Sequence, residues 1–254
     1  MDLLRVQDIT ESYQAENGEI FALDHISFSM EKGEFVSIVG PSGCGKSTLL
    51  SIISGLLPPT SGSILLDGKE VRGVDPRIGY MLQKDNLLEW RTIWKNVIFG
   101  LEVRRQLDGE TTARARRLLQ SYGLWEFRDK YPSQLSGGMR QRAALIRTLA
   151  TSPEILLLDE AFSALDYQTR LTVTDDVYRI LRRERITTIM VTHDIPESIS
   201  MGDRVMILTS RPARVGELLT IDFGPDRTPL SCRGDPRFSQ YFDHIWKELK
   251  DDGN

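Results

Sequence analysis

The feature that most limits what this chain can fold into is a glycine-rich segment between a predicted strand and a predicted helix. The apolar run at 35–39 predicts a buried strand, and the helical spacing of apolar residues in 46–53, ended by Gly55, predicts a helix. Residues 40–47 lie between them and match the pattern of a glycine, four residues, then Gly-Lys-Ser or Gly-Lys-Thr. Backbone N–H groups and the positive end of a helix converge in such a turn, so the segment predicts a phosphate-binding loop.

Two side chains of this loop carry its chemistry. Lys46 is expected to neutralise the β- and γ-phosphates of a nucleotide, and the Ser47 hydroxyl is expected to bind Mg²⁺. Cys44 should contribute its backbone N–H, with a reactive thiol as the alternative. The residues expected to surround the phosphates are Gly40, Pro41, Ser42, Gly43, Cys44, Gly45, Lys46, Ser47 and Thr48.

A second predicted strand, at 155–158, ends in the two carboxylates of Asp159 and Glu160. Many strands end in acids, and this pair gains meaning only because a phosphate loop is present. Asp159 is then expected to hold Mg²⁺, and Glu160 to polarise the attacking water. His193 follows the next predicted strand, at 188–192, and ligands gather at that edge of an α/β sheet. We therefore expect His193 to be functional rather than structural.

The order of elements predicts an α/β fold. Strand patterns occur at 26–30, 63–66, 78–82, 155–158 and 188–192, and a terminal hairpin is expected from 205–209 and 214–221. The first of these should belong to a hairpin that leads into the strand at 35–39, and a helix is expected near 166–185. Residues 87–150 are rich in helix formers and arginine, which predicts a helical subdomain. Alternating strands and helices imply a mainly parallel sheet covered by helices.

Charge and composition exclude several classes of protein. The net charge is -4 with both signs interspersed, so no basic stripe offers a nucleic-acid surface. Every apolar run is far shorter than the roughly 20 residues of a membrane-spanning helix, and the N-terminus has no secretory signal pattern. The 2 cysteines lack metal-ligand spacing and fit a reducing compartment. These features predict a cytosolic protein without nucleic acid as a partner.

Further motifs resemble those of ABC ATPases. Residues 135–142, Leu-Ser-Gly-Gly-Met-Arg-Gln-Arg, resemble the signature motif of that family. Gln83 resembles the Q-loop glutamine, 163–166 the D-loop, and 192–194 the switch that contains His193. Tyr13 resembles the aromatic residue that stacks on adenine, although Phe21 competes for that role. The resemblance covers about residues 3–221, with the motifs in the family's order.

The resemblance implies a fold and an activity. The fold would be a P-loop NTPase (RecA-like) core with an N-terminal antiparallel β-subdomain and an inserted α-helical subdomain at about 87–150. Residues 1–225 would form the ATPase domain and 226–254 a short tail with an amphipathic helix. ATP and Mg²⁺ would be the cofactors of an ATP hydrolase. Besides the phosphate loop, the implied roles are Lys46, Glu160 and His193 in catalysis; Tyr13, Gln83, Ser136, Gly137, Gly138 and Asp166 at the nucleotide; and Ser47, Gln83 and Asp159 at the metal.

The resemblance also implies partners. A second copy would bind head to tail, so that each ATP contacts the phosphate loop of one subunit and Ser136 and Gly138 of the other. A separate membrane permease would contact 83–90 and on to 96–97, with Leu87, Leu88, Trp90 and Trp94 as candidates; each could instead belong to the subdomain core. The chain would lie peripherally on the cytoplasmic side of the membrane.

Residues 83–90, with 210–215 and the short tail, look most like the ATPases of nitrate, sulfonate and taurine uptake systems. This implies an importer of a small anionic solute that works indirectly with a substrate-binding protein. An exporter or lipid-trafficking ATPase is an alternative, as is a soluble non-transport ATPase acting on DNA or ribosomes. The tail has one apolar helical face, which favours packing on the protein's own body over docking or regulation.

Three residues depart from the family's pattern. Met139 stands where glutamine is frequent, Ala161 where proline is common, and Glu89 where the uptake subfamily commonly has proline. The change at Glu89 leaves the partner contact less defined. None of the three removes a catalytic group, so an active enzyme is expected.

Overall fold

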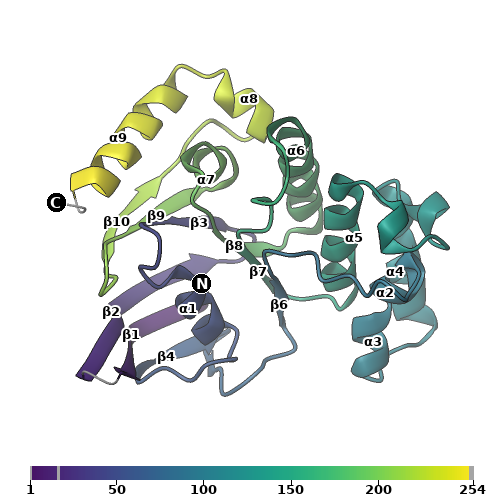
Figure 1. Ribbon diagram of the computed structural model, residues 1–254, viewed down its shortest axis with the longest axis horizontal. Helices are drawn as coiled ribbons and strands as arrows, with labels where there is room; N and C mark the ends of the chain where they lie inside the picture. Colours follow the sequence, from purple (N-terminus) through teal and green to yellow (C-terminus); the bar gives the residue numbers. More distant parts are fainter. Residues whose placement is uncertain (1, 16–17, 252–254) are drawn as a thin grey trace.

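The computed structural model describes residues 2–15 and 18–251, which form two β-sheets, helices around them and a separate group of helices. In Figure 1 the sheets occupy the left and centre, and the helical group lies at the right. The strand order is β2-β1-β4-β5 in the smaller sheet and β10-β9-β3-β8-β7-β6 in the larger one. The smaller sheet is antiparallel throughout.

The larger sheet is the centre of the fold. It consists of β3 (Phe35–Val39), β6 (Ile78–Met81), β7 (Ile155–Asp159), β8 (Thr187–Val191), β9 (Arg204–Leu208) and β10 (Val215–Thr220). All neighbours pair in parallel except β9 and β10, which form the expected terminal hairpin. Every residue of β3 and β8 is buried, as continuous apolar runs covered on both faces should be. The prediction of a mainly parallel sheet is therefore confirmed.

The smaller sheet consists of β1 (Asp2–Ala15), β2 (Gly18–Glu31), β4 (Ser61–Leu66) and β5 (Lys69–Glu70). The alternating residues Ile26, Phe28 and Met30 lie on β2, which pairs with β1 and then leads into β3. Their side chains are buried in one apolar cluster with residues of the larger sheet and of α1 (Lys46–Ile53). This shared core fixes the small sheet against the loop that precedes α1.

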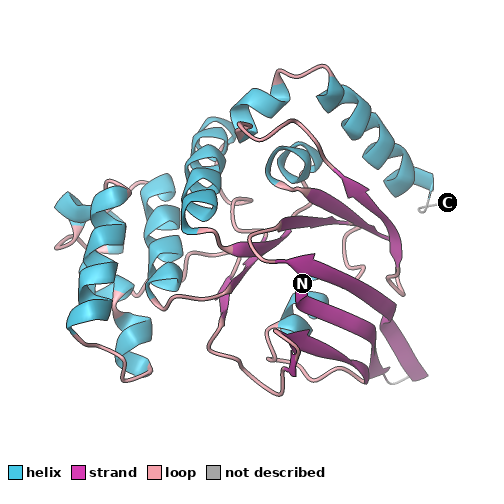
Figure 2. Cartoon of the chain, turned by 180° about the vertical axis from the view of Figure 1, so that it is seen from behind, coloured by secondary structure: helices cyan, strands magenta, loops and turns pink. Residues whose placement is uncertain are grey.

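The helical group is inserted between β6 and β7. It contains α2 (Ile93–Val97), α3 (Phe99–Val103), α4 (Gly109–Ser121) and α5 (Gly137–Ala150), with 3-10 turns at Trp125–Phe127 and Pro132–Gln134. Asp108 starts α4 with a capping box, in which its side chain accepts from Thr111 N. Seen from behind in Figure 2, this group stands beside the sheets, and α5 is the helix nearest to them. The alanines and leucines of α5 are buried in one cluster with residues of α6 (Tyr167–Glu184).

The C-terminal segment covers the other end of the large sheet. It contains α8 (Pro229–Arg233) and α9 (Arg237–Asp251), and α9 contacts α7 (Ile195–Met201) and β9. Ile245 is fully buried between them, whereas Trp246 faces outward with 56% of its surface exposed. The tail helix thus packs on the protein's own body. Among the described residues, no helix combines the length and apolar character that crossing a membrane requires.

Candidate functional site

The glycine-rich loop joins the carboxyl end of β3 to the N-terminus of α1. Gly45 occupies the position before α1 with φ 124°, which only glycine adopts readily. A Cβ atom there would also lie 2.8 Å from Cδ2 of Leu23, on β2. The loop can therefore take this path only with glycine at 45, which brings backbone N–H groups to the positive end of α1.

Lys46 is buried inside this loop. Its Nζ donates to the carbonyl oxygens of Gly40 and Pro41, both at 2.8 Å, and only 7% of the residue is exposed. The Cys44 Sγ lies 3.9 Å from the same Nζ, and burial raises the pKa of the Cys44 thiol. The loop thus holds a cation ready for phosphate oxygens, while Cys44 stays a protonated thiol rather than a reactive thiolate.

Asp159 lies at the end of β7, within hydrogen-bond distance of the loop. The Ser47 hydroxyl donates to its Oδ1 at 3.1 Å, and the Tyr80 hydroxyl donates to its Oδ2, also at 3.1 Å. Burial raises the pKa of Asp159, while the hydrogen bonds from Ser47 and Tyr80 act in the opposite direction. A hydroxyl and a carboxylate side by side are the oxygen donors that Mg²⁺ prefers, so these residues fit that ion.

Glu160 and His193 meet at the same edge of the sheet. The Nδ1 atom of His193 lies 3.3 Å from Oε2 of Glu160, and the Glu160 backbone N–H donates to Val191 O at 2.9 Å. Glu160 has a positive φ of 47°, a conformation that non-glycine residues adopt mainly where the surroundings enforce it. The arrangement places a carboxylate and an imidazole where they can act on one water molecule.

Gln83 is connected to Glu160 through Ser163. Its Nε2 donates to Ser163 Oγ at 3.2 Å, and that hydroxyl donates to Glu160 O at 2.9 Å. In this arrangement Gln83 is bonded to Ser163 and not to Ser47 or Asp159. A movement of the Gln83 segment would consequently change the hydrogen bond between Ser163 and the Glu160 carbonyl oxygen.

Tyr13 and Phe21 lie on opposite faces of the small sheet. Ser12 is directly opposite Phe21 in the ladder and shares its face, so the adjacent Tyr13 points to the other face. The Tyr13 hydroxyl is 3.4 Å from Thr48 Oγ1, at the end of the phosphate loop. Of the two aromatic residues, only Tyr13 has this contact with the loop.

The signature segment forms the N-terminus of α5, beside α6. Ser136 caps α5 by accepting from Met139 N at 3.4 Å, and Asp166 caps α6 by accepting from Thr169 N at 3.0 Å. A Cβ on Gly137 would lie 3.2 Å from Cδ2 of Leu165, and one on Gly138 would lie 2.8 Å from Cγ2 of Val173. Among the described residues, no hydrogen bond joins the Ser136 or Asp166 side chain to the phosphate loop. The signature segment is thus a helix N-terminus that is separate from the phosphate loop of the same chain.

The segment after Gln83 is tied to α5 by arginines. Arg140 makes a bidentate contact with Asp85, at 2.9 and 3.1 Å, and a further ion pair with Glu89 at 2.8 Å. Burial is the largest single influence and would raise the pKa of Asp85, but the hydrogen bonds from Arg140 and from the Leu87 backbone, with the charges of Arg140 and Arg147, together lower that pKa. Arg147 adds hydrogen bonds to the carbonyl oxygens of Asp85 and Asn86, at 2.8 and 2.6 Å. Glu89, which departs from the family's pattern, is therefore held by this network.

The expected partner contact divides into buried and exposed residues. Leu87, Asn96 and Val97 are buried, and Leu87 and Val97 belong to the core of the helical group; for Leu87 this is the alternative role that the sequence left open. Trp94 is half-buried, with its ring edge-on to Trp125 at 5.9 Å. Trp90 remains as a surface candidate, with 75% of its area exposed.

Some residues of the site were not expected from the sequence. Tyr80 was assigned only to a strand, yet it donates to Asp159; Arg140 was placed in the signature motif without its role on Asp85. The other two departures are accommodated by packing, because Ala161 is buried and Met139 lies against the core of the helical group.

Known proteins share both the sequence and this fold. A family model described as "ABC transporter" matches residues 23–163. The ABC transporter ATP-binding protein YtlC of Bacillus subtilis is 45% identical over 250 residues, covering 98% of this chain and 96% of that protein. The nitrate import ATP-binding protein NrtD of Synechocystis is 39% identical, covering 97% and 95%, and the nitrate transport protein NasD of Klebsiella oxytoca is 37% identical, covering 93% and 92%.

A solved structure agrees with the fold as well. It is the dimeric ATP-binding cassette MJ0796 in a post-hydrolysis state bound to ADP and Pi, with a TM-score of 0.72 and 32% identity. The match covers 87% of this chain and 100% of that one. The fold is the P-loop NTPase fold, with an antiparallel β-sheet and an inserted group of helices. The chain belongs to the ABC transporter family and is one of its ATP-binding, ATP-hydrolysing proteins.

Proposed function

We propose that this protein is the ATPase subunit of an ABC importer and powers uptake of a small anionic solute, such as nitrate, a sulfonate or taurine, through a separate permease. The observation that carries the importer assignment is the match along nearly the whole chain to the nitrate import protein NrtD, at 39% identity. The solute-selecting part of such a system lies in other chains, so the class of solute rests on that relative.

For nucleotide binding, we assign the β- and γ-phosphates to Lys46 and to the backbone of residues 40–48. Lys46 is buried beside two loop carbonyls, and phosphate oxygens would replace those weaker acceptors with charged ones. Adenine would stack on Tyr13, which is the aromatic residue beside Thr48.

We assign Mg²⁺ to Ser47 and Asp159, with Gln83 reaching the ion after leaving Ser163. The 3.1 Å contact between the Ser47 hydroxyl and Asp159 already brings two oxygen ligands together. When bound, Mg²⁺ would neutralise charge on the β- and γ-phosphate oxygens. Tyr80 would keep Asp159 oriented through its hydrogen bond to Oδ2.

For hydrolysis, Glu160 would accept the proton of the attacking water, and His193 would contact the γ-phosphate and orient that water. Their side chains are 3.3 Å apart at Nδ1 and Oε2, close enough to share one water molecule. Lys46 would stabilise the negative charge that spreads over the transferred phosphoryl group.

The active assembly would be a head-to-tail dimer. Ser136 and Gly137 are exposed at the N-terminus of α5, with Gly138 buried behind them, so a phosphate of a second copy could bind there; the related cassette MJ0796 is described as dimeric. Asp166, exposed at the start of α6, would face the partner's nucleotide. ATP would hold the two copies together, and hydrolysis would release them.

The membrane partner would bind next to the exposed Trp90, and the protein would lie peripherally on the cytoplasmic side of the membrane. Trp90 follows the Arg140-bound segment that begins at Gln83, so a force on this surface reaches Ser163 and Glu160 through the hydrogen bonds described above. A substrate-binding protein would act indirectly, through the permease.

The test is reconstitution of this protein with its permease and substrate-binding protein in lipid vesicles. ATP-dependent accumulation of nitrate or a sulfonate is expected, together with faster ATP hydrolysis when the loaded binding protein is added. Glu160→Gln should abolish both, whereas Trp90→Ala should reduce transport more than the ATPase rate of the isolated chain. Outward movement of solute, or recovery of the protein with ribosomes and no membrane protein, would refute the importer assignment.

A further inference from the structure

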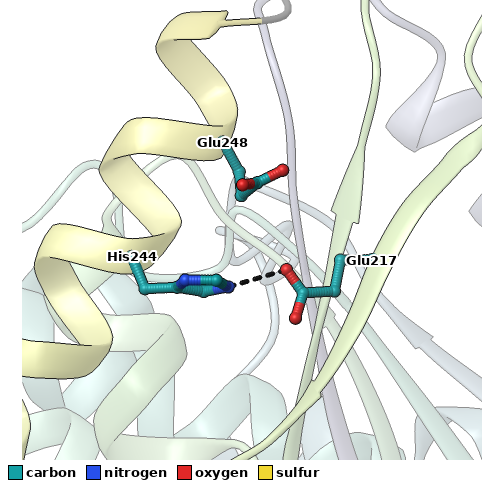
Figure 3. A group of neighbouring side chains, drawn as sticks. All are labelled: Glu217, His244 and Glu248. Carbon is teal, nitrogen blue, oxygen red and sulfur yellow. Dashed lines mark hydrogen bonds and ion pairs between the residues drawn. The ribbon is translucent and has the colours of Figure 1, made fainter.

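A group of potential metal ligands lies at the C-terminal end of the molecule, outside the nucleotide site. It consists of Glu217 on β10 and of His244 and Glu248 on α9, and Figure 3 shows their side chains gathered between the helix and the strand. One ligand atom from each residue lies within 4.8 Å of the other two. None of these residues takes part in the nucleotide chemistry.

The surrounding packing fixes the two elements that supply these side chains. Ile245, between His244 and Glu248 in the sequence, is fully buried against α7 and β9. The Tyr241 hydroxyl accepts a hydrogen bond from Asp222 N at 3.1 Å, just after β10. His244 and Glu248 are four positions apart, so they lie on one face of α9. The ligands are therefore brought together by the apolar core and need no ion to assemble.

The charges in this group are incompletely compensated. The His244 ring Nε2 is 2.7 Å from Oε2 of Glu217, so these two side chains are hydrogen-bonded to each other. Within the described part of the chain, the Glu248 carboxylate has no hydrogen bond or ion pair, although it lies next to the Glu217 carboxylate. Two carboxylates at this separation repel each other, and a cation between them would remove that cost.

The size of the group suits a small transition-metal ion. Zinc bonds to imidazole nitrogen and carboxylate oxygen are about 2.0–2.2 Å, which separates neighbouring ligand atoms of a tetrahedral site by about 3.4 Å. The His244–Glu217 contact would open slightly and the Glu248 carboxylate would move inward, which side-chain rotations allow. Imidazole is a poor ligand for Mg²⁺ and Ca²⁺, so the donor set excludes those ions in favour of Zn²⁺ or a neighbouring divalent metal.

We propose that Glu217, His244 and Glu248 bind one divalent transition-metal ion, with Zn²⁺ as the best fit, and that this ion fastens the tail helix to the edge strand of the large sheet. One nitrogen and two carboxylate oxygens come from the protein, and water completes the coordination. Glu217 and His244 are 27 positions apart and lie on different elements, so the ion cross-links the C-terminal helix to the body of the molecule.

The chain contains its own control for this proposal. His25 is also exposed and also lies beside two acids, with Nδ1 2.6 Å from Asp8 Oδ1 and Nε2 3.5 Å from Asp24 Oδ1. Those contacts use opposite nitrogens of the ring, so the two carboxylates cannot converge with one nitrogen on a single ion. His25→Ala should leave metal binding unchanged.

The experiment uses the full chain, freed of metal by chelation and without nucleotide. Co²⁺ is titrated while its visible absorption is recorded, and Zn²⁺ binding is measured by calorimetry. We expect one ion per chain, with affinity reduced more than about tenfold in His244→Ala and in Glu248→Gln but retained in His25→Ala. Unchanged affinity in both site variants, or the absence of Co²⁺ absorption and of Zn²⁺ heat in the wild type, would overturn the proposal.

Thermal unfolding distinguishes a metal site from a simple ion pair between His244 and Glu217. Glu248 has no described partner and lies beside the Glu217 carboxylate, so metal-free Glu248→Gln should unfold at or slightly above the wild-type temperature. It should lose the increase in Tm that Zn²⁺ gives the wild type. If Zn²⁺ raises the Tm of Glu248→Gln as much as that of the wild type, the stabilising ion is bound elsewhere and the proposal fails.

Discussion

Replacement of Asn96 by alanine should cost more stability than the size of the side chain indicates. Asn96 is fully buried, and its Oδ1 accepts from Leu88 N at 2.7 Å. Its Nδ2 donates to the carbonyl oxygens of Leu88, Arg91 and Thr92, at 3.1, 3.1 and 3.0 Å. The amide of Asn96 thus provides hydrogen bonds to the backbone groups of Leu88, Arg91 and Thr92, on both sides of Trp90.

The magnitude follows from which of these backbone groups have a second partner. The Leu88 carbonyl also accepts from Arg91 N at 3.0 Å, and the Thr92 carbonyl also accepts from Asn96 N at 2.8 Å, so both stay bonded in the variant. The Leu88 N–H and the Arg91 carbonyl oxygen would lose their hydrogen bonds to the Asn96 side chain. At about 1–3 kcal/mol for each of the two unsatisfied groups, Asn96→Ala should lower the free energy of unfolding by about 2–6 kcal/mol.

Urea denaturation of the full chain, followed by circular dichroism, measures this difference. Thr92→Ala is the matched control, because it removes only the cap of α2, a 3.3 Å contact with Lys95 N, and should cost about 1 kcal/mol. The ATPase rate of folded Asn96→Ala should stay near that of the wild type, since Asn96 has no contact with the nucleotide residues. A loss no greater than that of Thr92→Ala would refute the reasoning.

Other variants test the catalytic site and its surroundings. Glu160→Gln should keep ATP binding and trap the dimer while hydrolysis falls by at least about a hundredfold, as single-turnover assays would show; wild-type turnover would remove Glu160 as the base. Lys46→Ala should instead weaken ATP binding itself, measurable with a fluorescent nucleotide, and unaltered affinity would contradict the role of Lys46. Burial raises the pKa of Glu197 to about 7, from 4.5, so the protonated form is favoured in the folded state. The contribution of Glu197 to stability should therefore be complete below about pH 4.5 and fall by about 3 kcal/mol as pH rises to 7. Denaturation of Glu197→Gln at several pH values should lack this contribution.

The strands of the large sheet were predictable because their surroundings leave a simple pattern. The apolar runs of β3, β7 and β8 are buried on both faces, and no alternation is needed to recognise them. β1 was not expected, because register shifts such as the one between Val6 and Ile9 break the alternation that identifies a strand. α7 was also missed, although Asp194 and Pro196 are ordinary helix-start signals.

The residues of the site were predictable only where local sequence carries the chemistry. Lys46, Asp159 and Glu160 lie in motifs whose spacing is fixed by one loop or one strand end. Tyr80 comes near Asp159 because β6 pairs with β7 in a register that sets Tyr80 opposite Leu157, on the same face as Asp159. That register is a tertiary property, and no local pattern around Tyr80 encodes it.

Gly138 illustrates why the second half of the nucleotide site is harder to test than the first. A Cβ atom on Gly138 would lie 2.8 Å from Cγ2 of Val173, so a side chain there disturbs the contact of α5 with α6 before any nucleotide binds. Asp166 has the same difficulty, because its side chain caps α6. Ser136 is exposed, and its side chain makes only the long 3.4 Å contact with Met139 N among the described residues. Loss of dimer closure after Ser136→Ala would therefore report on phosphate binding, whereas the same loss after a change at Gly138 would report on helix packing as well.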